Sequence, residues 1–160
     1  MPSTDARKIK ERFKIIPEVF LLLTQDEKVL LSRRFQTGYE DGNYGLPAGH
    51  GEYGETMREG TTREAQEEIG ITIDPNDLGF AITQHRWCPD PDNNHARIGF
   101  YFVPKKFAGT PHNTEPEKCD DLQFFSLDNL PSNMVPHMRA VIEAYNSGEK
   151  YTEFNWETKI

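Results

Sequence analysis

Three glutamates close together near the end of one short segment are the residues of this chain best suited to do chemistry. Glu64, Glu67 and Glu68 stand at positions i, i+3 and i+4. In an α-helix this spacing places all three side chains on one side, within an arc of about 100°. Carboxylates at that density repel one another unless a cation lies among them. The pattern therefore indicates a divalent metal site, for Mg²⁺ or alternatively Mn²⁺, because both prefer hard oxygen ligands.

Three glutamates on one helix face are also common on ordinary solvated surfaces, so the neighbouring residues have to favour one interpretation. Gly49, Gly51 and Gly54 allow the close backbone approach that a loop beside a phosphate needs. Arg63 can pair with a carboxylate such as Glu55 and hold that loop against the helix. These features favour the metal site, and a metal here predicts an anionic, phosphorylated substrate.

The helix that carries the glutamates is predicted over residues 55–69, with Gly70 as its C-terminal cap. Gly60 inside this helix costs about 1 kcal/mol relative to alanine, so packing must compensate for it. Four residues at four-residue spacing are predicted to face the core: Met57, Thr61, Ala65 and Ile69.

The remaining segments predict strands and one more helix, without strict alternation of the two. A buried strand over residues 17–24 is expected to form a hairpin with residues 29–34, and residues 37–45 form a glycine-rich loop. The other expected elements are strands at 78–87, 97–103 and 122–126 and a helix at 135–146. This order favours a mixed sheet with helices on both faces. Three aromatic residues in the tail predict docking, on the same domain or across a dimer: Tyr151, Phe154 and Trp156.

The bulk composition fits one soluble globular domain over residues 1–160. The chain is 36% hydrophobic and 28% charged, and no apolar run approaches the length of a membrane span. The N-terminus lacks the apolar centre of a secretory signal, and two cysteines are too few for a disulfide framework or a zinc site. We therefore expect a cytoplasmic protein that does not bind membranes.

The overall charge argues against a nucleic-acid scaffold. The formal net charge is −8, whereas proteins that bind polymeric DNA or RNA are usually basic. The basic stretch at residues 6–14 is expected to be a solvated arm or a short helix. A small phosphorylated ligand still suits an acidic protein, because a bound cation reverses the sign of the local field.

Residues 49–71 resemble the Nudix box, Gly-x5-Glu-x7-Arg-Glu-U-x-Glu-Glu-x-Gly-U, where U is a large aliphatic residue. Every fixed position is met, and Ala65 stands at one aliphatic position as a common variant. The preceding residues, Leu46 to Gly49, also look like the family. The wider resemblance covers about residues 15–146 and is closest to small stand-alone MutT-like members.

The resemblance implies a Nudix fold, an α/β/α sandwich of the α+β type with a mixed β-sheet. It implies Mg²⁺-dependent hydrolysis of a nucleoside diphosphate linked to another group, with a homodimer as a family-level expectation. Glu64, Glu67 and Glu68 would be metal ligands, and Glu64 or Glu68 would also orient or deprotonate the attacking water. Glu55 and Arg63 would be the supporting pair.

Several residues outside the glutamate helix are candidates for the same site. Similar family members carry a further glutamate in the loop before the last strand, where Glu117 is the first choice and Glu115 the second for a catalytic metal ligand. Gly49 and His50 are expected beside the phosphates, and an ordinary solvent-facing position is the alternative for His50.

An arginine at the end of the second predicted strand is the candidate phosphate contact. Strand alternation puts Arg33 and Arg34 on opposite faces, so only one can reach the pocket, and Arg34 is the choice. Trp87 or Tyr39 could stack on a base, although either aromatic ring could equally serve in ordinary packing.

Three hypotheses for function follow. The first is hydrolysis of a nucleoside triphosphate to a monophosphate and diphosphate. The second keeps the enzyme but changes the substrate to ADP-ribose or a nucleotide sugar. The third is a non-catalytic ligand-binding module, which retention of every box glutamate disfavours.

Overall fold

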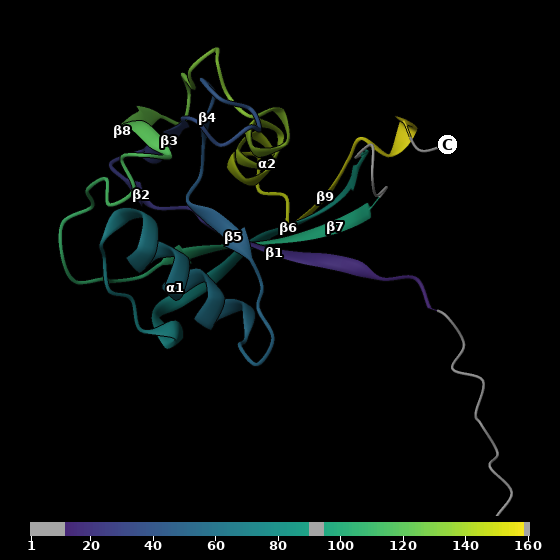
Figure 1. The fold of residues 1–160 in the computed structure, drawn as a ribbon, viewed down its shortest axis with the longest axis horizontal. Coiled ribbons are helices and arrows are strands. Elements are labelled where there is room, and N and C mark those ends of the chain that lie inside the picture. Colours follow the sequence, from purple (N-terminus) through teal and green to yellow (C-terminus); the bar gives the residue numbers. More distant parts are fainter. Residues whose placement is uncertain (1–11, 90–94, 159–160) are drawn as a thin grey trace, which may run out of the picture.

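Two β-sheets and two α-helices form the part of the chain that the computed structural model describes, residues 12–89 and 95–158 (Figure 1). The first sheet has the order β5-β1-β7-β6-β9. Its strands are β1 (Ile15–Leu21), β5 (Ala48–His50), β6 (Leu78–Cys88), β7 (His95–Pro104) and β9 (Tyr151–Phe154). The pairs β1–β7 and β6–β9 are parallel and the others antiparallel. The expected mixed sheet is therefore confirmed.

The second sheet is antiparallel and centres on β3 (Lys28–Arg34). Its other strands are β2 (Thr24–Gln25), β4 (Tyr44–Gly45) and β8 (Cys119–Ser126). The expected hairpin between residues 17–24 and 29–34 was wrong in part. The apolar run divides, so that β1 joins the first sheet and only β2 pairs with β3. Because residues 18–23 are all buried, the composition of the run carries no signal of the change of sheet.

The helices α1 (Met57–Ile69) and α2 (Pro136–Asn146) lie on opposite faces of the first sheet (Figure 1). Strand alternation explains this, because Phe20 and Leu22 pack in the cluster with α2 while Leu21 and Leu23 pack in the cluster with α1. This arrangement confirms the sandwich. Two short 3₁₀ helices, η1 (Pro75–Asp77) and η2 (Trp156–Thr158), complete the described elements.

Local sequence signals fix both ends of α1. Thr56 accepts a hydrogen bond from the Glu59 backbone while the Glu59 side chain accepts one from the Thr56 backbone, which is a capping box. Gly70 ends the helix in the left-handed conformation with φ 67°, as expected. Thr61, Ala65 and Ile69 of the expected stripe are buried, and the fourth member, Met57, packs at the edge of the core.

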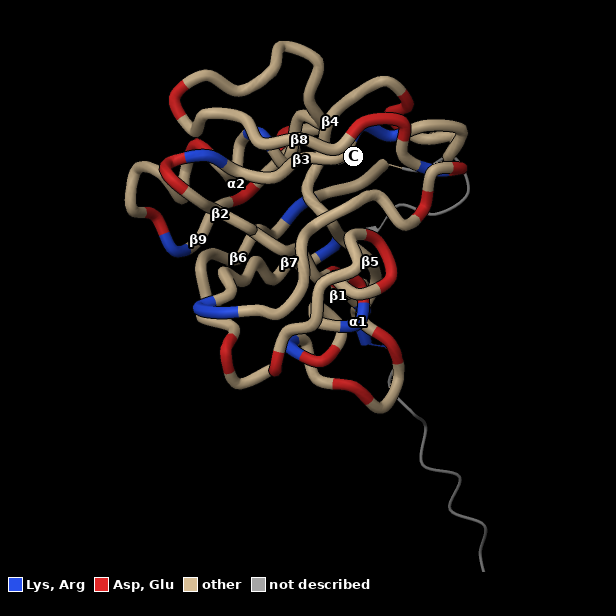
Figure 2. Tube along the Cα trace, turned by 90° about the vertical axis from the view of Figure 1, so that its left-hand side faces the viewer, with Lys and Arg blue, Asp and Glu red and all other residues tan. Residues whose placement is uncertain are grey.

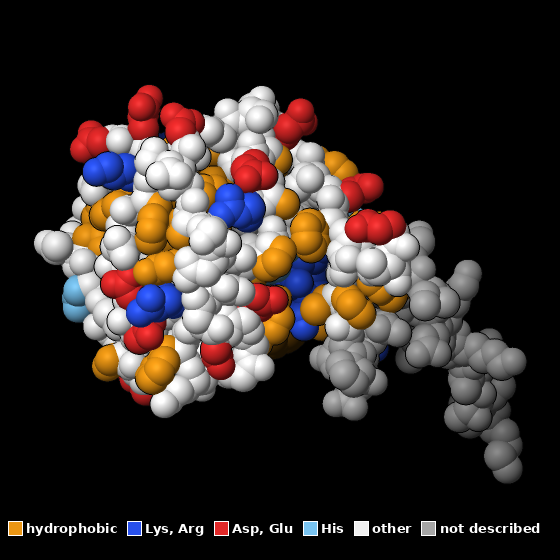
Figure 3. Space-filling model, turned by 90° about the horizontal axis from the view of Figure 1, so that it is seen from above, with side chains coloured by type: hydrophobic (Ala, Val, Ile, Leu, Met, Phe, Trp, Pro, Cys, Tyr) orange, Lys and Arg blue, Asp and Glu red, His pale blue; other side chains and the backbone are white. Residues whose placement is uncertain are grey.

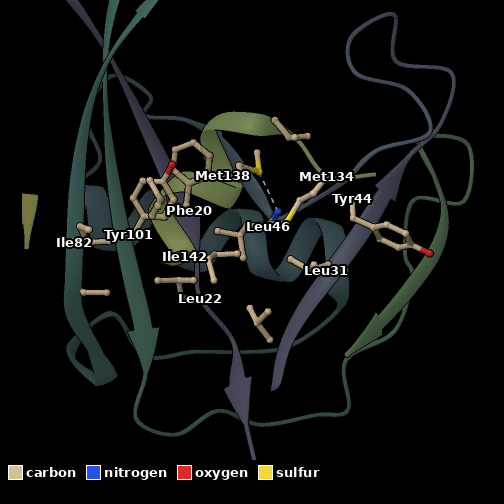
Figure 4. Packing of buried hydrophobic residues seen from close by; sticks show 14 residues of the cluster. Phe20, Leu22, Leu31, Tyr44, Leu46, Ile82, Tyr101, Met134, Met138 and Ile142 are labelled. Carbon is tan, nitrogen blue, oxygen red and sulfur yellow. Dashed lines mark hydrogen bonds between the residues drawn. The ribbon is translucent and has the colours of Figure 1, made fainter. Parts of the chain in front are cut away.

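The cluster on the α2 side also anchors the segment that leads into the site (Figure 4). The rings of Phe20 and Tyr101 stack with their centroids 4.2 Å apart. The backbone N–H of Leu46 donates to the sulfur of Met138 at 3.1 Å, the contact drawn as a dashed line in Figure 4. Core packing thereby holds the strand that precedes the glutamate helix.

The C-terminal tail docks on its own domain. β9 adds to β6 in parallel, and Trp156 Nε1 donates to the His85 carbonyl at 2.9 Å. The first of the two expected modes of docking is therefore seen, and the homodimer stays a prediction. Most of the basic stretch at residues 6–14 lies outside the described residues. Neither helix of the described part is long and apolar enough to cross a membrane.

Candidate active site

A cleft of about 1050 Å³ brings most of the predicted site residues together. It runs from one side of α1, across β5, to the face of the first sheet beneath α2. Figure 2 shows acidic positions gathered along α1 and beside β5. The predicted residues that line the cleft are Arg34, Gly49, His50, Arg63, Glu64, Glu67, Glu68 and Glu115.

Arg63 is the centre of the ion-pair network beside the cleft. Its Nε and Nη2 donate to the two oxygens of Glu55 at 3.1 and 2.9 Å, and its Nη1 donates to Glu64 at 2.6 Å. Nη2 also donates to the His50 carbonyl at 3.2 Å. The bidentate pair lowers the pKa of the Glu55 carboxyl. The expected Arg63–Glu55 pair is therefore present, and it ties the loop between β5 and α1 to the helix.

Two glycines let these carboxylates approach the backbone. A Cβ on Gly49 would lie 1.9 Å from Glu64 Oε1, so the carboxylate occupies the space of the missing side chain. A Cβ on Gly60 would lie 2.8 Å from Glu55 Oε1. The helix-weakening glycine noted in the sequence is thus explained, because it provides room for the partner of Arg63.

Among the carboxylates that line the cleft, Glu68 is the one whose ionised form is most disfavoured. Its Oε2 accepts one hydrogen bond from the Ala48 backbone at 2.9 Å. Burial raises the pKa of Glu68 to about 8, and the nearby charges of Glu64 and Glu115 add to that rise. Burial also raises the pKa of Glu64, although Arg63 opposes the shift. Arg63 pairs with Glu64 and Lys118 with Glu115, whereas Glu68 has no ion pair among the described residues, so its charge is the one that the protein leaves uncompensated.

A divalent cation fits this donor set, although the side chains do not yet form a closed site. In residues 12–89 and 95–158, no three carboxylate, imidazole or thiol side chains converge at a common ligand position. Glu64 is held by Arg63 and Glu68 by the Ala48 backbone. The groups that face the cleft here are carboxylate oxygens, which divalent cations prefer as ligands. A cation would offset the burial, and the nearby negative charge, that raise the pKa of Glu68.

The structure favours the second of the two glutamates considered before β8. Glu115 lines the cleft, and its backbone N–H donates to Asn113 Oδ1 at 3.0 Å. Glu117, the first choice, is exposed and does not line the cleft. Spacing alone could not decide between them, because the turn at residues 115–118 is what orients each side chain.

Glu115→Gln is expected to lower kcat by about tenfold or more, since it removes a charge that faces Glu68 across the cleft. Glu117→Gln, its matched control, is expected to stay within about twofold of wild type, as for other exposed positions. Steady-state hydrolysis by both variants checks this. A larger loss in Glu117→Gln than in Glu115→Gln would restore the original choice.

Arg34 faces the cleft and Arg33 faces away, as strand alternation predicts. Arg33 pairs with Asp120 at 2.7 Å. Arg34 donates through Nε to the Tyr39 carbonyl at 2.6 Å, and its guanidinium lies 5.2 Å from the centre of the Tyr39 ring. Arg34 therefore orders the loop between β3 and β4, residues 35–43, which we call the rim loop. It also keeps a positive charge at the mouth of the cleft.

Of the two aromatic candidates for base stacking, only Tyr39 lines the cleft. Tyr39 remains 46% exposed, so part of its ring is accessible to a ligand. Trp87 is not among the lining residues, and its ring packs 5.5 Å from that of Trp156. The prediction of Trp87 as a substrate contact is therefore not supported, and the tail that covers it is the physical reason.

A buried ion cluster at the other end of the cleft was not predicted from the sequence. Glu18, Arg86 and Arg97 come from three strands of the first sheet and meet beneath α2. Charged residues inside largely apolar strands are rare unless they are paired. That mismatch between residue type and strand context was the available signal.

Comparison with known proteins agrees with this geometry. The family described as NUDIX domain matches residues 14–145. The "Phosphatase NudJ" of Escherichia coli (strain K12) is 30% identical over 119 residues, which cover 69% of this chain and 74% of that protein. The "NAD-capped RNA hydrolase NudC" of Stutzerimonas stutzeri is 29% identical over 119 residues, covering 74% of this chain. This chain spans only 39% of that longer relative.

Solved structures show the same fold. A MutT NUDIX hydrolase from Burkholderia pseudomallei superposes with a TM-score of 0.71 and 25% identity, covering 81% of this chain and 97% of that one. A bifunctional NMN adenylyltransferase/ADP ribose pyrophosphatase from Francisella tularensis superposes with a TM-score of 0.61 and 19% identity, covering 86% of this chain and 42% of that one. The family match, the NudJ relative and the shared fold together establish that this chain belongs to the NUDIX family of hydrolases.

Proposed function

We propose that this enzyme hydrolyses a nucleoside diphosphate linked to another group, and that a nucleoside triphosphate is its first substrate class, giving a monophosphate and diphosphate. The observation that supports this most is the gathering of Glu64, Glu68 and Glu115 in one cleft, where burial and the nearby like charges raise the pKa of Glu68. Mg²⁺, or Mn²⁺ as the alternative, would be held by these three carboxylates and by Glu67. A bound cation would neutralise phosphate charge and acidify a bound water.

The chain's own residues supply position and proton transfer. The Ala48 N–H fixes one oxygen of Glu68, and Arg63 fixes one oxygen of Glu64. Each keeps a second oxygen for a cation or a water, so both remain candidates for the group that orients or deprotonates the attacking water. The Arg63–Glu55 pair holds the loop between β5 and α1 in a fixed position against the helix for this role.

The opposite rim of the cleft is suited to the nucleotide. Arg34 carries a positive charge there, and the exposed face of Tyr39 offers a stacking surface. The backbone at Gly49 and His50 lies on the edge strand between this rim and the glutamates. This order along the cleft supports phosphates near β5 with the base toward the rim loop.

A second candidate, a dinucleotide-like diphosphate such as ADP-ribose, has specific support from the relatives. Two similar proteins are named for activity on NAD-capped RNA and on ADP ribose. A cleft of about 1050 Å³ is large enough for two linked nucleosides. Our expectation that polymeric nucleic acid is not a partner rests on the net charge of −8 and stays a prediction, so NAD-capped RNA belongs among the test substrates.

The test is hydrolysis with Mg²⁺ across nucleoside triphosphates (standard and oxidised), ADP-ribose, NAD⁺, nucleotide sugars, dinucleoside polyphosphates and NAD-capped RNA. Products are identified by mass, with Glu68→Gln as the blank. We expect a monophosphate and diphosphate from one group of triphosphates. Turnover confined to the dinucleotide-like substrates would establish the second candidate. No metal-dependent turnover of any substrate would contradict the proposed function.

A further inference from the structure

The ion cluster at the far end of the cleft carries a surplus positive charge. Glu18 on β1, Arg86 on β6 and Arg97 on β7 have side chains only 8%, 9% and 19% exposed. Two guanidinium groups thus share a single carboxylate. Figure 3 shows Lys or Arg side chains recessed among hydrophobic ones on one face of the molecule.

The carboxylate in this cluster is fully used by the protein. Arg86 Nη2 donates to both oxygens of Glu18 at 2.9 and 3.0 Å, and Arg97 Nη1 donates to Oε1 at 2.7 Å. Arg86 Nε adds a weaker bond to Oε2 at 3.3 Å. Glu18 therefore has little capacity left to accept hydrogen bonds from a ligand, and it balances only one of the two arginines.

Donor capacity, by contrast, remains on Arg97. Among the described residues, its contacts run only through Nη1, to Glu18 and to His50 Nε2 at 3.2 Å. Its Nε is buried and has no acceptor within the described part of the chain. A buried donor without a partner is costly, and an accepting ligand group would remove that cost.

The cluster is open to the same cleft as the glutamates. Glu18, Arg86 and Arg97 all line the cleft. Glu18 of β1 lies opposite His50 of β5 in the strand register. The residue before His50, Gly49, lies against the Glu64 side chain. A molecule held at the glutamates can therefore extend into the cluster by crossing a single edge strand.

The chemistry of this end selects one kind of ligand group. Base edges present donors as well as acceptors, and Glu18, the acceptor within the cluster, is already used by the two arginines. A phosphate group presents acceptors only and is negatively charged, which matches donors with a surplus positive charge. We propose that Arg86 and Arg97 form a second anion subsite, which binds a phosphate of the substrate beyond the diphosphate at the glutamates.

This inference rests on the proposed function, and two substrate classes could supply the phosphate. It is either the third phosphate of a nucleoside triphosphate or a phosphate on the distal nucleoside of a dinucleotide. In both cases the subsite would select substrates that carry one more phosphate than the reaction itself requires. Arg97 would then determine specificity without contacting the bond that is broken.

A binding experiment that does not depend on turnover tests the subsite directly. Thermal unfolding is followed with EDTA present and inorganic phosphate added, so that no metal site contributes. We expect phosphate to raise the Tm of the wild type and of Arg33→Gln, and to leave that of Arg97→Gln unchanged. Arg33 is the matched control because it neighbours the cleft but pairs with Asp120 outside it.

The Arg97→Gln variant is chosen because it should fold. Glu18 keeps its bidentate pair with Arg86, so the variant leaves a neutral pair rather than an unpaired buried charge. Equal stabilisation of Arg97→Gln and the wild type by phosphate would overturn the subsite. Absence of stabilisation in the wild type would overturn it as well.

Matched substrates then identify the source of the phosphate. ATP and ADP differ by the third phosphate, while NADP⁺ and NAD⁺ differ by a phosphate on the distal nucleoside. We expect Arg97→Gln to raise KM by about tenfold for the phosphate-bearing member of one pair, with kcat nearly unchanged. The substrate class is identified by the pair of substrates for which the variant loses the preference for the phosphate-bearing member. An equal KM change for both members of each pair would overturn the inference. If none of these substrates is hydrolysed, the result counts against the proposed function instead. The phosphate titration then tests the subsite by itself.

Discussion

Glu68→Gln is expected to lower kcat by at least about 100-fold and at the same time to stabilise the metal-free enzyme at alkaline pH. The two effects have one cause. The Glu68 carboxylate is half-buried near Glu64 and Glu115, and this burial makes its charge unfavourable until a cation is bound. Gln keeps the shape and can still accept from the Ala48 N–H, but it removes both the charge and the metal ligand.

The pH dependence follows from the raised pKa. The carboxyl of Glu68 titrates near pH 8 in the folded protein, against its ordinary value of 4.5 in the unfolded chain. Its stabilising contribution is therefore fully present below about pH 4.5 and is lost as the pH rises through 8. With EDTA at pH 9, Glu68→Gln should have the higher Tm, by roughly 2–4 °C for each kcal/mol of repulsion relieved. The difference should shrink as the pH falls through this range and disappear only below about pH 4.5.

Added Mg²⁺ should narrow this difference. Saturation at about 100 times the Kd stabilises a protein by about 2.7 kcal/mol, and only the wild type should gain it. Glu67→Gln should also lose turnover, although its side chain is 54% exposed and little change in metal-free stability is expected. Glu143→Gln on α2 is the control for both. Full activity in Glu67→Gln and Glu68→Gln together would refute the assignment of the metal site.

Gly49→Ala is the second substitution from which we expect a large effect. The added Cβ would lie 1.9 Å from Glu64 Oε1, closer than any stable contact, so the Glu64 carboxylate must move. A displacement of about 1 Å in a catalytic group can cost about 100-fold in rate. Because a flexible carboxylate and not the backbone has to give way, we expect kcat to fall by about that factor while the free energy of unfolding changes by no more than about 1–3 kcal/mol.

A methyl group added to another strand glycine separates this effect from a general one. At Gly79 on β6 the nearest atom to an added Cβ is 3.6 Å away, an ordinary contact. Gly79→Ala should therefore retain full activity and near-wild-type stability. Wild-type kcat in Gly49→Ala would show that the position of Glu64 against Gly49 is not needed for catalysis.

The local chemistry of the site could be predicted from the sequence because it depends on short separations. The spacing of Glu64, Glu67 and Glu68 is a property of helix geometry, and the capping role of Gly70 is a property of its backbone freedom. The Arg63–Glu55 pair joins residues eight apart across a single turn and helix. Alternation along β3 predicted that only one of Arg33 and Arg34 reaches the cleft, and Arg34 lines it.

Choices that depend on which segments meet in space could not be made this way. Glu115 and Glu117 differ by two positions in one loop, and only the turn held by Asn113 turns Glu115 toward the cleft. Trp87 was predicted to contact the base, but in the structure Trp156 of the tail packs against it. The division of the first apolar run between two sheets depends on strand pairing, which the composition of a fully buried run does not encode.

The sequence by itself thus determined the family, the helix of carboxylates and the pair that braces it, because each is set by residues a few positions apart. The tertiary structure alone decided the far end of the cleft. Glu18, Arg86 and Arg97 come from strands β1, β6 and β7, and they become one charged group only when β7 pairs with both of the others. The role of a charged residue depends on whether it is buried and on which residue it pairs with. Both depend on how the strands assemble into the sheet.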